Sequence, residues 1–439
     1  MEVTVIGAGL VGCLLTCYLA RRGHTVTLYE RRPDPRVAGA DRGRSINLAL
    51  SERGLDALRR VGLAERVMAE ALPMRGRMMH ALDGTLTFQP YSADGTQAIN
   101  SISRGELNRV LLDAALELPG VTVRFDHRLT GIDGDELVFN GDVREKAGVV
   151  LGADGAYSVV RDHLRWNYSQ DYLDYGYKEL TIPPGSGLDK GALHIWPRGS
   201  SMMIALPNPD DSFTCTLFWP RADFDVPDPA EVLRRSYPDV EFSAEEYTGN
   251  PVGSLVTVRC SPWSMASERM TVGLVGDAAH AIVPFYGQGA NCGFEDCVEL
   301  DRCLEETGDD FAAALTRYEQ RRKPNTDTIA DLALDNFVEM RDKVGSKLFL
   351  AGKKAEHAIE RLLPGRYLSR YELVSFTTTP YSQIEGRIRR QRLALAAAGV
   401  AGLGVLGYAW RFLRLPSCMA WTRAIGIVRP SSTRSSGKG

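Results

Sequence analysis

Near its start the chain reads Val3-Thr4-Val5-Ile6-Gly7-Ala8-Gly9-Leu10-Val11-Gly12, a β-branched run that leads directly into three glycines spaced as GxGxxG. An apolar run of helical length follows, Gly23 stands where such a helix would end, and residues 25–29 form a second strand pattern that stops at Glu30. A strand, a glycine turn, a helix and a second strand ending in an acid about 20 residues after the glycines make up the dinucleotide-binding fingerprint. This stretch predicts the βαβ unit of a Rossmann-type α/β fold.

Each residue type in this unit has a physical role in binding a nucleotide. Gly7 permits the tight turn, Gly9 lets the backbone approach a pyrophosphate, and Gly12 lets the helix pack closely against the strand. The helix N-terminus offers N–H groups and a positive dipole end to phosphate. Glu30 can accept hydrogen bonds from a ribose, which favours FAD or NAD over NADP at this site. The alternative is a glycine-rich turn in another α/β protein, but the combined spacing favours nucleotide binding.

The composition is that of an ordinary globular protein. The chain has 439 residues, enough for two or three domains, and its formal net charge of −3 does not indicate a nucleic-acid surface. Its 8 cysteines include no CxxC pair, and Cys292, Cys297 and Cys303 lack histidines at zinc-binding spacing. We therefore expect reduced, buried thiols in a cytosolic protein, with no metal site and no nucleic-acid partner. Because a strand begins at Val3, we expect no signal peptide.

Two later stretches return to the nucleotide-binding pattern. A buried strand breaks at Asp154-Gly155, and another ends at Gly276-Asp277-Ala278-Ala279-His280 before a long helix that starts near Gly287-Gln288-Gly289. Between them, residues 175–260 carry short alternating strands, the pattern of an antiparallel sheet with one solvated face. We expect a nucleotide-binding domain, an inserted β-sheet domain that would hold the substrate, and a helical C-terminal region: residues 1–72, 100–174 and 261–320; residues 73–99 and 175–260; and residues 321–385.

The last segment, residues 386–439, is basic and apolar in turn. Arginines cluster at 387–392, and residues 393–410 form an uncharged apolar run. Eighteen helical residues would span about 27 Å, just short of a hydrocarbon core of about 30 Å. We expect a membrane anchor at 393–410, and the alternative is a helix packed on the catalytic body. The Ser-, Arg- and Gly-rich tail after Pro430 is expected to be disordered.

The three nucleotide-binding stretches together resemble the single-component flavin-dependent aromatic hydroxylases. The resemblance implies a tightly bound, non-covalent FAD, with Asp277 accepting hydrogen bonds from the ribityl hydroxyls and Arg104 neutralising the pyrophosphate. The helix that opens near Gly287 would aim N–H groups at the flavin and stabilise negative charge on the reduced ring. The sequence has no second GxGxxG for a nicotinamide domain, so NADPH is expected to bind transiently as a co-substrate.

Four further stretches narrow the resemblance to the kynurenine 3-monooxygenase family. They are GRSINLALS at 43–51, MRGRM at 74–78, LHIWPR at 193–198 and GDAAHAIVPFYGQGANCGFEDC at 276–297. The similarity extends from residue 3 to about residue 385, and the apolar C-terminal run has a counterpart in the membrane-anchored eukaryotic members. An arginine that binds the substrate carboxylate through a bidentate guanidinium matches Arg77. The other implied substrate-binding residues are Tyr91, Asn336, Tyr381, Phe285 and Gln288.

The resemblance also implies FAD contacts at the glycine turn, at the end of the second strand, at several single positions and at the start of the long helix: Gly7, Gly9, Val11, Gly12, Tyr29, Glu30, Arg31, Arg32, Ala49, Arg104, Leu129, Asp154, Asp277, Ala290 and Asn291. Without it, Arg104 reads as a surface charge, and Leu129 and His280 as core residues. The family usually has Met-Asn-Ala after Gly-Gln-Gly, whereas this chain has Ala290-Asn291-Cys292. Contacts there are therefore expected through the backbone.

The reaction implied by the resemblance is the hydroxylation of L-kynurenine to 3-hydroxykynurenine with NADPH and O2, through a flavin C4a-hydroperoxide. No side chain is assigned as a catalytic acid or base. Two alternatives stay open: the same chemistry on a related aryl amine or phenol, and a non-catalytic protein that shares the flavin fold. A cytoplasmic catalytic body anchored to a membrane by its C-terminus is the expected location.

Overall fold

The structure is a computed structural model, and it describes residues 1–37, 46–92, 94–164, 167–342 and 367–395. Met1–Gly386 form one compact unit and Arg387–Gly439 a second. Among the described residues, no helix is long and apolar enough to cross a membrane. The anchor expected at 393–410 lies outside the described residues from 396 onward, as do Gly43 and Arg44 of the GRSINLALS stretch.

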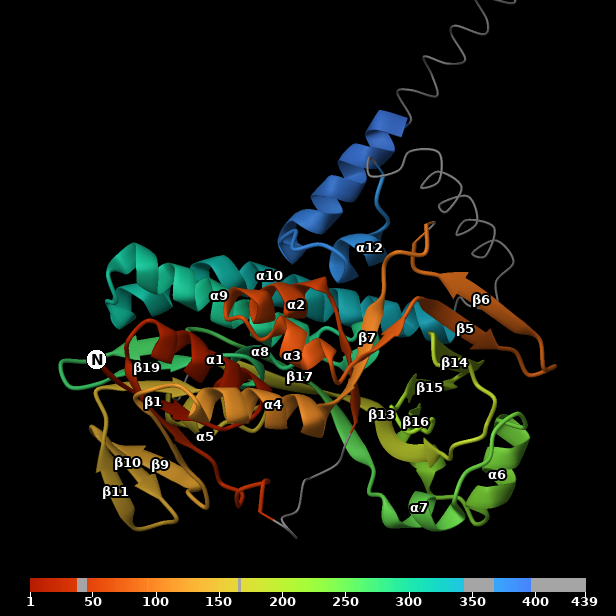
Figure 1. The fold of residues 1–439 in the computed structure, drawn as a ribbon, viewed down its shortest axis with the longest axis horizontal. Coiled ribbons are helices and arrows are strands. Elements are labelled where there is room, and N and C mark those ends of the chain that lie inside the picture. Colours follow the sequence, from red (N-terminus) through yellow and green to blue (C-terminus); the bar gives the residue numbers. More distant parts are fainter. Residues whose placement is uncertain (38–45, 93, 165–166, 343–366, 396–439) are drawn as a thin grey trace, which may run out of the picture. The chain divides into compact units, whose positions relative to one another are not determined.

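A six-stranded sheet in the first unit carries the glycine turn (Figure 1). Its order is β18-β19-β12-β1-β2-β8, and every neighbouring pair is parallel except β18–β19 at the edge. The β-branched runs of the sequence supply its central strands, because a parallel sheet covered on both faces needs apolar side chains throughout. The strands are β1 (Glu2–Ile6), β2 (Thr25–Tyr29), β8 (Val121–Arg124), β12 (Val149–Gly152), β18 (Ser264–Ala266) and β19 (Thr271–Leu274).

Helices pack on this sheet and bury one continuous apolar core. Helix α1 lies against α4 and α9, and α10 runs along α9. Gly23 follows α1 with a φ of 88°, the left-handed conformation that ends many helices. These helices are α1 (Leu10–Arg21), α2 (Glu52–Arg60), α3 (Ala64–Met68), α4 (Arg104–Leu116), α5 (Val159–Leu164), α8 (Asp277–His280), α9 (Gly289–Thr307) and α10 (Phe311–Asp342).

A seven-stranded sheet has the order β17-β13-β16-β15-β14-β5-β6, and all its strands except β17 are labelled in the right half of Figure 1. All neighbours are antiparallel except β5 and β14, which are parallel. Residues 76–90 thus share a sheet with residues 168–260. The strands are β5 (Gly76–His80), β6 (Leu86–Pro90), β13 (Tyr168–Ile182), β14 (Ala192–Arg198), β15 (Ser201–Pro207), β16 (Phe213–Pro220) and β17 (Gly253–Cys260).

The expectation that one face of this sheet is solvated is wrong. Helices α6 (Pro229–Ser236) and α7 (Ala244–Gly249) supply apolar side chains that pack on one face, around Trp196. On the other face, Met202 and Phe218 pack with Phe285 and with residues of α10. The alternation in the sequence therefore separates two buried faces, since each is covered by a different part of the chain.

The described part of the first unit also contains two three-stranded sheets, two short 3-10 helices and a short C-terminal helix: β3 (Asn47–Leu50), β7 (Ile99–Ser103) and β4 (Leu72–Met74); β9 (Leu129–Asp133), β10 (Glu136–Phe139) and β11 (Val143–Lys146); η1 (Arg221–Phe224) and η2 (Pro284–Tyr286); and α12 (Arg370–Ser375). Residues 381–386 are helical as well. The predicted fold class, a Rossmann-type α/β domain with an inserted β-sheet and C-terminal helices, is confirmed.

Candidate active site

The glycine turn between β1 and α1 has the shape that a pyrophosphate requires. Gly7 has a φ of 102°, a conformation that glycine adopts without steric cost. A Cβ on Gly12 would lie 1.9 Å from the Gly7 carbonyl oxygen, whereas a Cβ on Gly9 would meet nothing within 4 Å. Gly9 is the N-cap of α1, whose first turn carries no acidic residue. The turn is therefore closed where helix and strand meet, and open where a phosphate would approach the helix N-terminus.

Glu30, at the end of β2, is held beside this turn. Its buried carboxylate accepts the Ala8 N–H at 2.9 Å through Oε2, and the backbone N–H and Nε of Arg32 at 3.0 and 2.9 Å through Oε1. Tyr29 is buried and Arg31 is exposed. The acid thus sits where the fingerprint places it for a ribose hydroxyl.

The turn after β19 lies against α1. Gly276 has a φ of 65°, and a Cβ there would lie 3.1 Å from a side-chain carbon of Val11. The next residue, Asp277, is exposed. Helix α9 starts nearby at Gly289 without an acidic residue in its first turn. The Asp277 carboxylate can therefore accept hydrogen bonds from hydroxyl groups, and the positive N-terminus of α9 can stabilise an anionic ring edge.

Asn291 joins the end of β3 to the start of α9. Its Oδ1 accepts the Ser51 N–H at 2.9 Å, and its Nδ2 donates to the carbonyl oxygens of Ala49 and Gly287, each at 2.9 Å. The amide is thus engaged by the protein itself. A contact between Asn291 or its neighbour Ala290 and a flavin would be made through the backbone.

Three further predicted cofactor residues differ in their exposure and in their contacts. Leu129 is buried in the core, and Arg104 is exposed in the first turn of α4. Asp154 caps α5, since its Oδ2 accepts the N–H groups of Val159 and Val160 at 2.8 and 3.3 Å. Its Oδ1 is buried with no hydrogen-bond partner among the described residues, and burial raises the pKa of this carboxyl. An unpartnered oxygen beside the glycine turn, together with the open turn itself, fits a bound FAD.

His280, Cys292 and Asp296 have ligand atoms within 4.8 Å of one another, but a guanidinium lies among them. Arg322 donates through Nε to Asp296 at 2.7 Å, and its Nη2 lies 3.2 Å from the Cys292 sulfur. His280 Nε2 lies 2.5 Å from Asp296, which also accepts the Gly276 N–H at 3.0 Å. Burial would raise the pKa of Asp296, but the charges of His280 and Arg322 lower it below its ordinary value. These residues form an ion-pair network that supports the Gly276 turn, since Arg322 would repel a metal cation.

Arg77 of β5 lies among aromatic side chains, in what we call the arginine–tyrosine cluster: Arg77, Tyr91, Tyr286, Tyr371 and Phe376. The guanidinium carbon of Arg77 is 4.1 Å from the ring centroid of Tyr371 and 5.9 Å from that of Tyr91. The Tyr371 ring stacks on the rings of Tyr91 and Tyr286, with centroids 5.4 and 6.0 Å apart. The Phe376 ring lies 5.7 Å from Tyr91. The cluster therefore joins β5, η2 and α12.

This cluster offers a fixed positive charge with an unused donor. Burial would lower the pKa of Arg77, but the nearby hydroxyls of Tyr371 and Tyr91 raise it above its ordinary value, so the guanidinium stays charged. Burial also raises the pKa of the Tyr91 phenol. Within the described parts of the chain, Arg77 Nε and the Tyr91 hydroxyl are buried and have no hydrogen-bond partner. A guanidinium and a phenol placed in this way suit a carboxylate.

The other predicted substrate residues form a neighbouring group. The Phe285 ring stacks on Phe337 at 4.3 Å, and Asn336 Nδ2 donates to the Phe285 carbonyl oxygen at 2.7 Å. The Tyr381 hydroxyl donates to Gln288 Oε1 at 3.0 Å, and both side chains are buried. Asn336 and Tyr381 therefore hold the η2–α9 segment in place. Tyr381 thus contacts Gln288, whereas the tyrosine that lies against Arg77 is Tyr371 of α12.

Three members of the arginine–tyrosine cluster were not assigned from the sequence. Tyr286 adjoins Phe285 within the quoted stretch 276–297, so its neighbourhood could have indicated it. Tyr371 lies in the short helix α12 and Phe376 directly follows it, without a motif at either position, and their contacts with Tyr91 join distant parts of the chain. Only the fold brings them together.

Comparisons with known proteins show the family and the fold of this chain. The family model described as "FAD binding domain" matches residues 1–333. The chain is 49% identical over 405 residues to kynurenine 3-monooxygenase of Myxococcus xanthus, covering 86% of each chain, and 40% identical over 420 residues to that of Sus scrofa, covering 90% of this chain and 88% of the relative. Among solved structures, 2-methyl-3-hydroxypyridine-5-carboxylic acid oxygenase matches with a TM-score of 0.68 at 22% identity, over 80% of this chain and 95% of that one, which shows a shared fold.

Proposed function

The chain belongs to the kynurenine 3-monooxygenase family and is an FAD-dependent monooxygenase, and from this premise we propose that it hydroxylates L-kynurenine to 3-hydroxykynurenine with NADPH and O2. The observation that carries the proposal is the arginine–tyrosine cluster. A charged arginine with a buried, unpartnered Nε lies 4.1 Å from a tyrosine ring and beside a phenol whose hydroxyl has no partner among the described residues. An aromatic amino acid supplies both the carboxylate and the ring that such a site would hold.

The side chains of this site have separable tasks. Arg77 and Tyr91 bind the substrate carboxylate by charge-assisted hydrogen bonds. The ring of Tyr371 packs against the guanidinium and limits its movement. Phe285 and Phe337, stacked at 4.3 Å, present an apolar surface that limits the access of water to the reacting ring.

When bound, FAD supplies hydride acceptance from NADPH and the activation of O2. Gly9 and Glu30 would hold its adenosine and pyrophosphate part, and Asp277 and the N-terminus of α9 its ribityl and flavin part. No side chain of the site is assigned as an acid or base. His280 is buried and paired with Asp296, which leaves it a supporting role.

The test is a product analysis with the full-length protein, NADPH, air and L-kynurenine. We expect a yellow protein, faster NADPH oxidation on addition of L-kynurenine, and formation of 3-hydroxykynurenine. A yellow protein that hydroxylates only another aryl amine or phenol would contradict the substrate assignment. A colourless protein that takes up no FAD would support the non-catalytic alternative.

We also propose that residues 393–410 anchor the protein to a membrane. The arginine-flanked apolar run 393–410 supports it by its composition. Carbonate washing of membranes from cells that make the full-length chain tests it. Retention in the pellet is the expected result, and release into the supernatant would exclude an integral anchor.

A further inference from the structure

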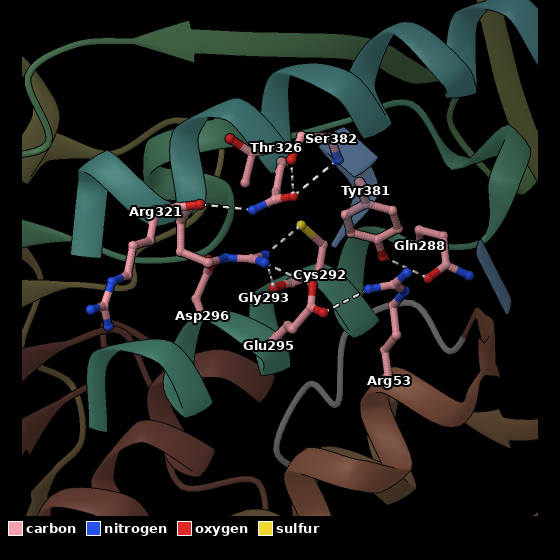
Figure 2. A network of polar contacts seen from close by, with 12 residues as sticks. Arg53, Gln288, Cys292, Gly293, Glu295, Asp296, Arg321, Thr326, Tyr381 and Ser382 are labelled. Atoms are coloured by element: carbon pink, nitrogen blue, oxygen red, sulfur yellow. Dashed lines mark hydrogen bonds and ion pairs between the residues drawn. The ribbon is translucent and has the colours of Figure 1, made fainter. Parts of the chain in front are cut away.

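Helix α12 carries Tyr371 into the arginine–tyrosine cluster, and polar contacts hold this helix and the chain after it. A capping box at Ser369 and Glu372 starts the helix. After the helix, the Tyr381 hydroxyl donates to Gln288, and the Ser382 N–H and hydroxyl donate to Asn325 Oδ1 at 3.0 and 2.9 Å (Figure 2). The capping box is internal to the helix, and the bonds of Tyr381 and Ser382 fix the chain that follows it, so none of these bonds fixes the C-terminus of α12.

Arg53 of α2 binds that C-terminus. Its Nε donates to the Val374 carbonyl oxygen at 2.9 Å, and its Nη2 donates to those of Leu373, at 3.2 Å, and Thr379. The last carbonyl groups of a helix lack intrahelical partners, and a cation there is favourable. The guanidinium also lies over the Tyr381 ring, with its carbon 3.8 Å from the ring centroid. The side chain of Arg53 is fully buried.

The same guanidinium continues into the ion-pair network below α12. Arg53 Nη1 donates to Glu295 at 2.7 Å (Figure 2), and Glu295 also pairs with Arg322 at 2.7 Å. Arg322 binds Asp296, which accepts the Gly276 N–H. A chain of charged groups therefore connects the C-terminus of α12 with the turn that precedes Asp277.

We propose that Arg53 is a positioning residue for substrate binding: it holds α12 by its terminal carbonyl groups and thereby holds Tyr371 against Arg77. The proposal rests on the proposed function, since it concerns the carboxylate subsite. Arg53 makes its four hydrogen bonds from three nitrogens spread over the planar guanidinium. A lysine ammonium has three donors on a single nitrogen, so lysine at this position keeps the charge but cannot make all of these bonds. The network borders a groove of about 500 Å³, which gives a shorter ammonium access to water and allows the variant to fold.

The experiment is a double-mutant cycle on the FAD-loaded, full-length protein with Arg53→Lys and Tyr371→Ala. The Kd for L-kynurenine is measured from the change that it causes in the flavin absorbance, and FAD content and Tm are recorded for each variant. We expect each single change to raise Kd about tenfold, and the double change to raise it no more than the larger single effect, because both act through one ring. Arg60→Lys is the matched control, since this exposed arginine lies on the same helix and its guanidinium pairs with Asp56 at 2.9 Å.

The outcomes distinguish a failure of the positioning role of Arg53 from a failure of the proposed kynurenine hydroxylation. If Arg53→Lys leaves Kd unchanged, or if the two effects multiply while Tm falls, Arg53 is a general stabiliser and the inference is wrong. If Arg53→Lys does not fold, Glu295→Gln takes its place in the cycle, since it removes the counter-charge that orients Arg53, and the same non-additivity is expected. A wild-type protein that binds FAD but shows no response to L-kynurenine would contradict the proposed function itself.

Discussion

Replacement of Arg77 by methionine tests the carboxylate site most directly. Methionine keeps an extended side chain against Tyr371 and removes the charge and all five donors. Removing one partner of a buried ion pair costs about 3–5 kcal/mol. Because Arg77 is partly exposed, we take the lower end, about 3 kcal/mol, which is roughly a 150-fold loss of affinity.

The assay compares steady-state formation of 3-hydroxykynurenine with NADPH consumption over a range of L-kynurenine concentrations. We expect the KM of Arg77→Met to rise by about two orders of magnitude, with FAD content unchanged. The decarboxylated amine should bind the variant and the wild type equally, since it has no carboxylate to lose. Arg75→Met is the matched control, because Arg75 is exposed and donates through Nη1 to the Gly95 carbonyl oxygen at 2.8 Å. A KM within threefold of wild type, by an order-of-magnitude criterion, would refute the carboxylate role of Arg77.

Three further predictions concern the cofactor site and stability. Gly9→Ala should lower the FAD content with little change in the Tm of the apoprotein, because the added Cβ meets open space. Gly12→Ala should lower the FAD content and the Tm, because the added Cβ would lie 1.9 Å from the Gly7 carbonyl oxygen. Equal effects of the two variants on Tm would contradict this prediction. Asp277→Asn should weaken FAD retention about tenfold or more, as expected for a hydrogen bond to a charged group, and unchanged flavin loss on dilution would show that Asp277 does not contact FAD. Burial lowers the pKa of His80 and His194 in the folded protein. Near and below the ordinary histidine pKa of about 6.5, the unfolded chain therefore binds more protons than the folded one, so the free energy of unfolding should fall as the pH drops from 7.5 to 5.5, by up to about 1.4 kcal/mol per proton and pH unit. A Tm that rises on acidification would contradict this prediction.

The sequence predicted well what short-range spacing decides. The strand, glycine turn, helix and acid from Val3 to Glu30 specify one another within a single βαβ unit, so their order alone indicates a nucleotide site. Asp277 was indicated in the same way, since it follows a β-branched strand. The seven described cysteines are all buried and free, as expected.

The prediction failed or stayed incomplete where the deciding contact joins distant segments. Period-2 alternation in residues 201–218 could not show that both faces of the sheet are covered, because the covering residues come from α6, α7, η2 and α10. Arg77 could be named from its motif, but its partner Tyr371 could not, since a stacking contact leaves no local pattern in a short helix.

The amino-acid order by itself therefore determined the Rossmann-type unit, the dinucleotide-binding fingerprint and the arginine motif around Arg77, because backbone geometry and residue spacing act over a few residues. The tertiary structure alone decided which tyrosine stands against that arginine and which buried cation holds it there. Those choices depend on close packing between β5, α2 and α12, and packing is a property of surfaces brought together from separate parts of the chain.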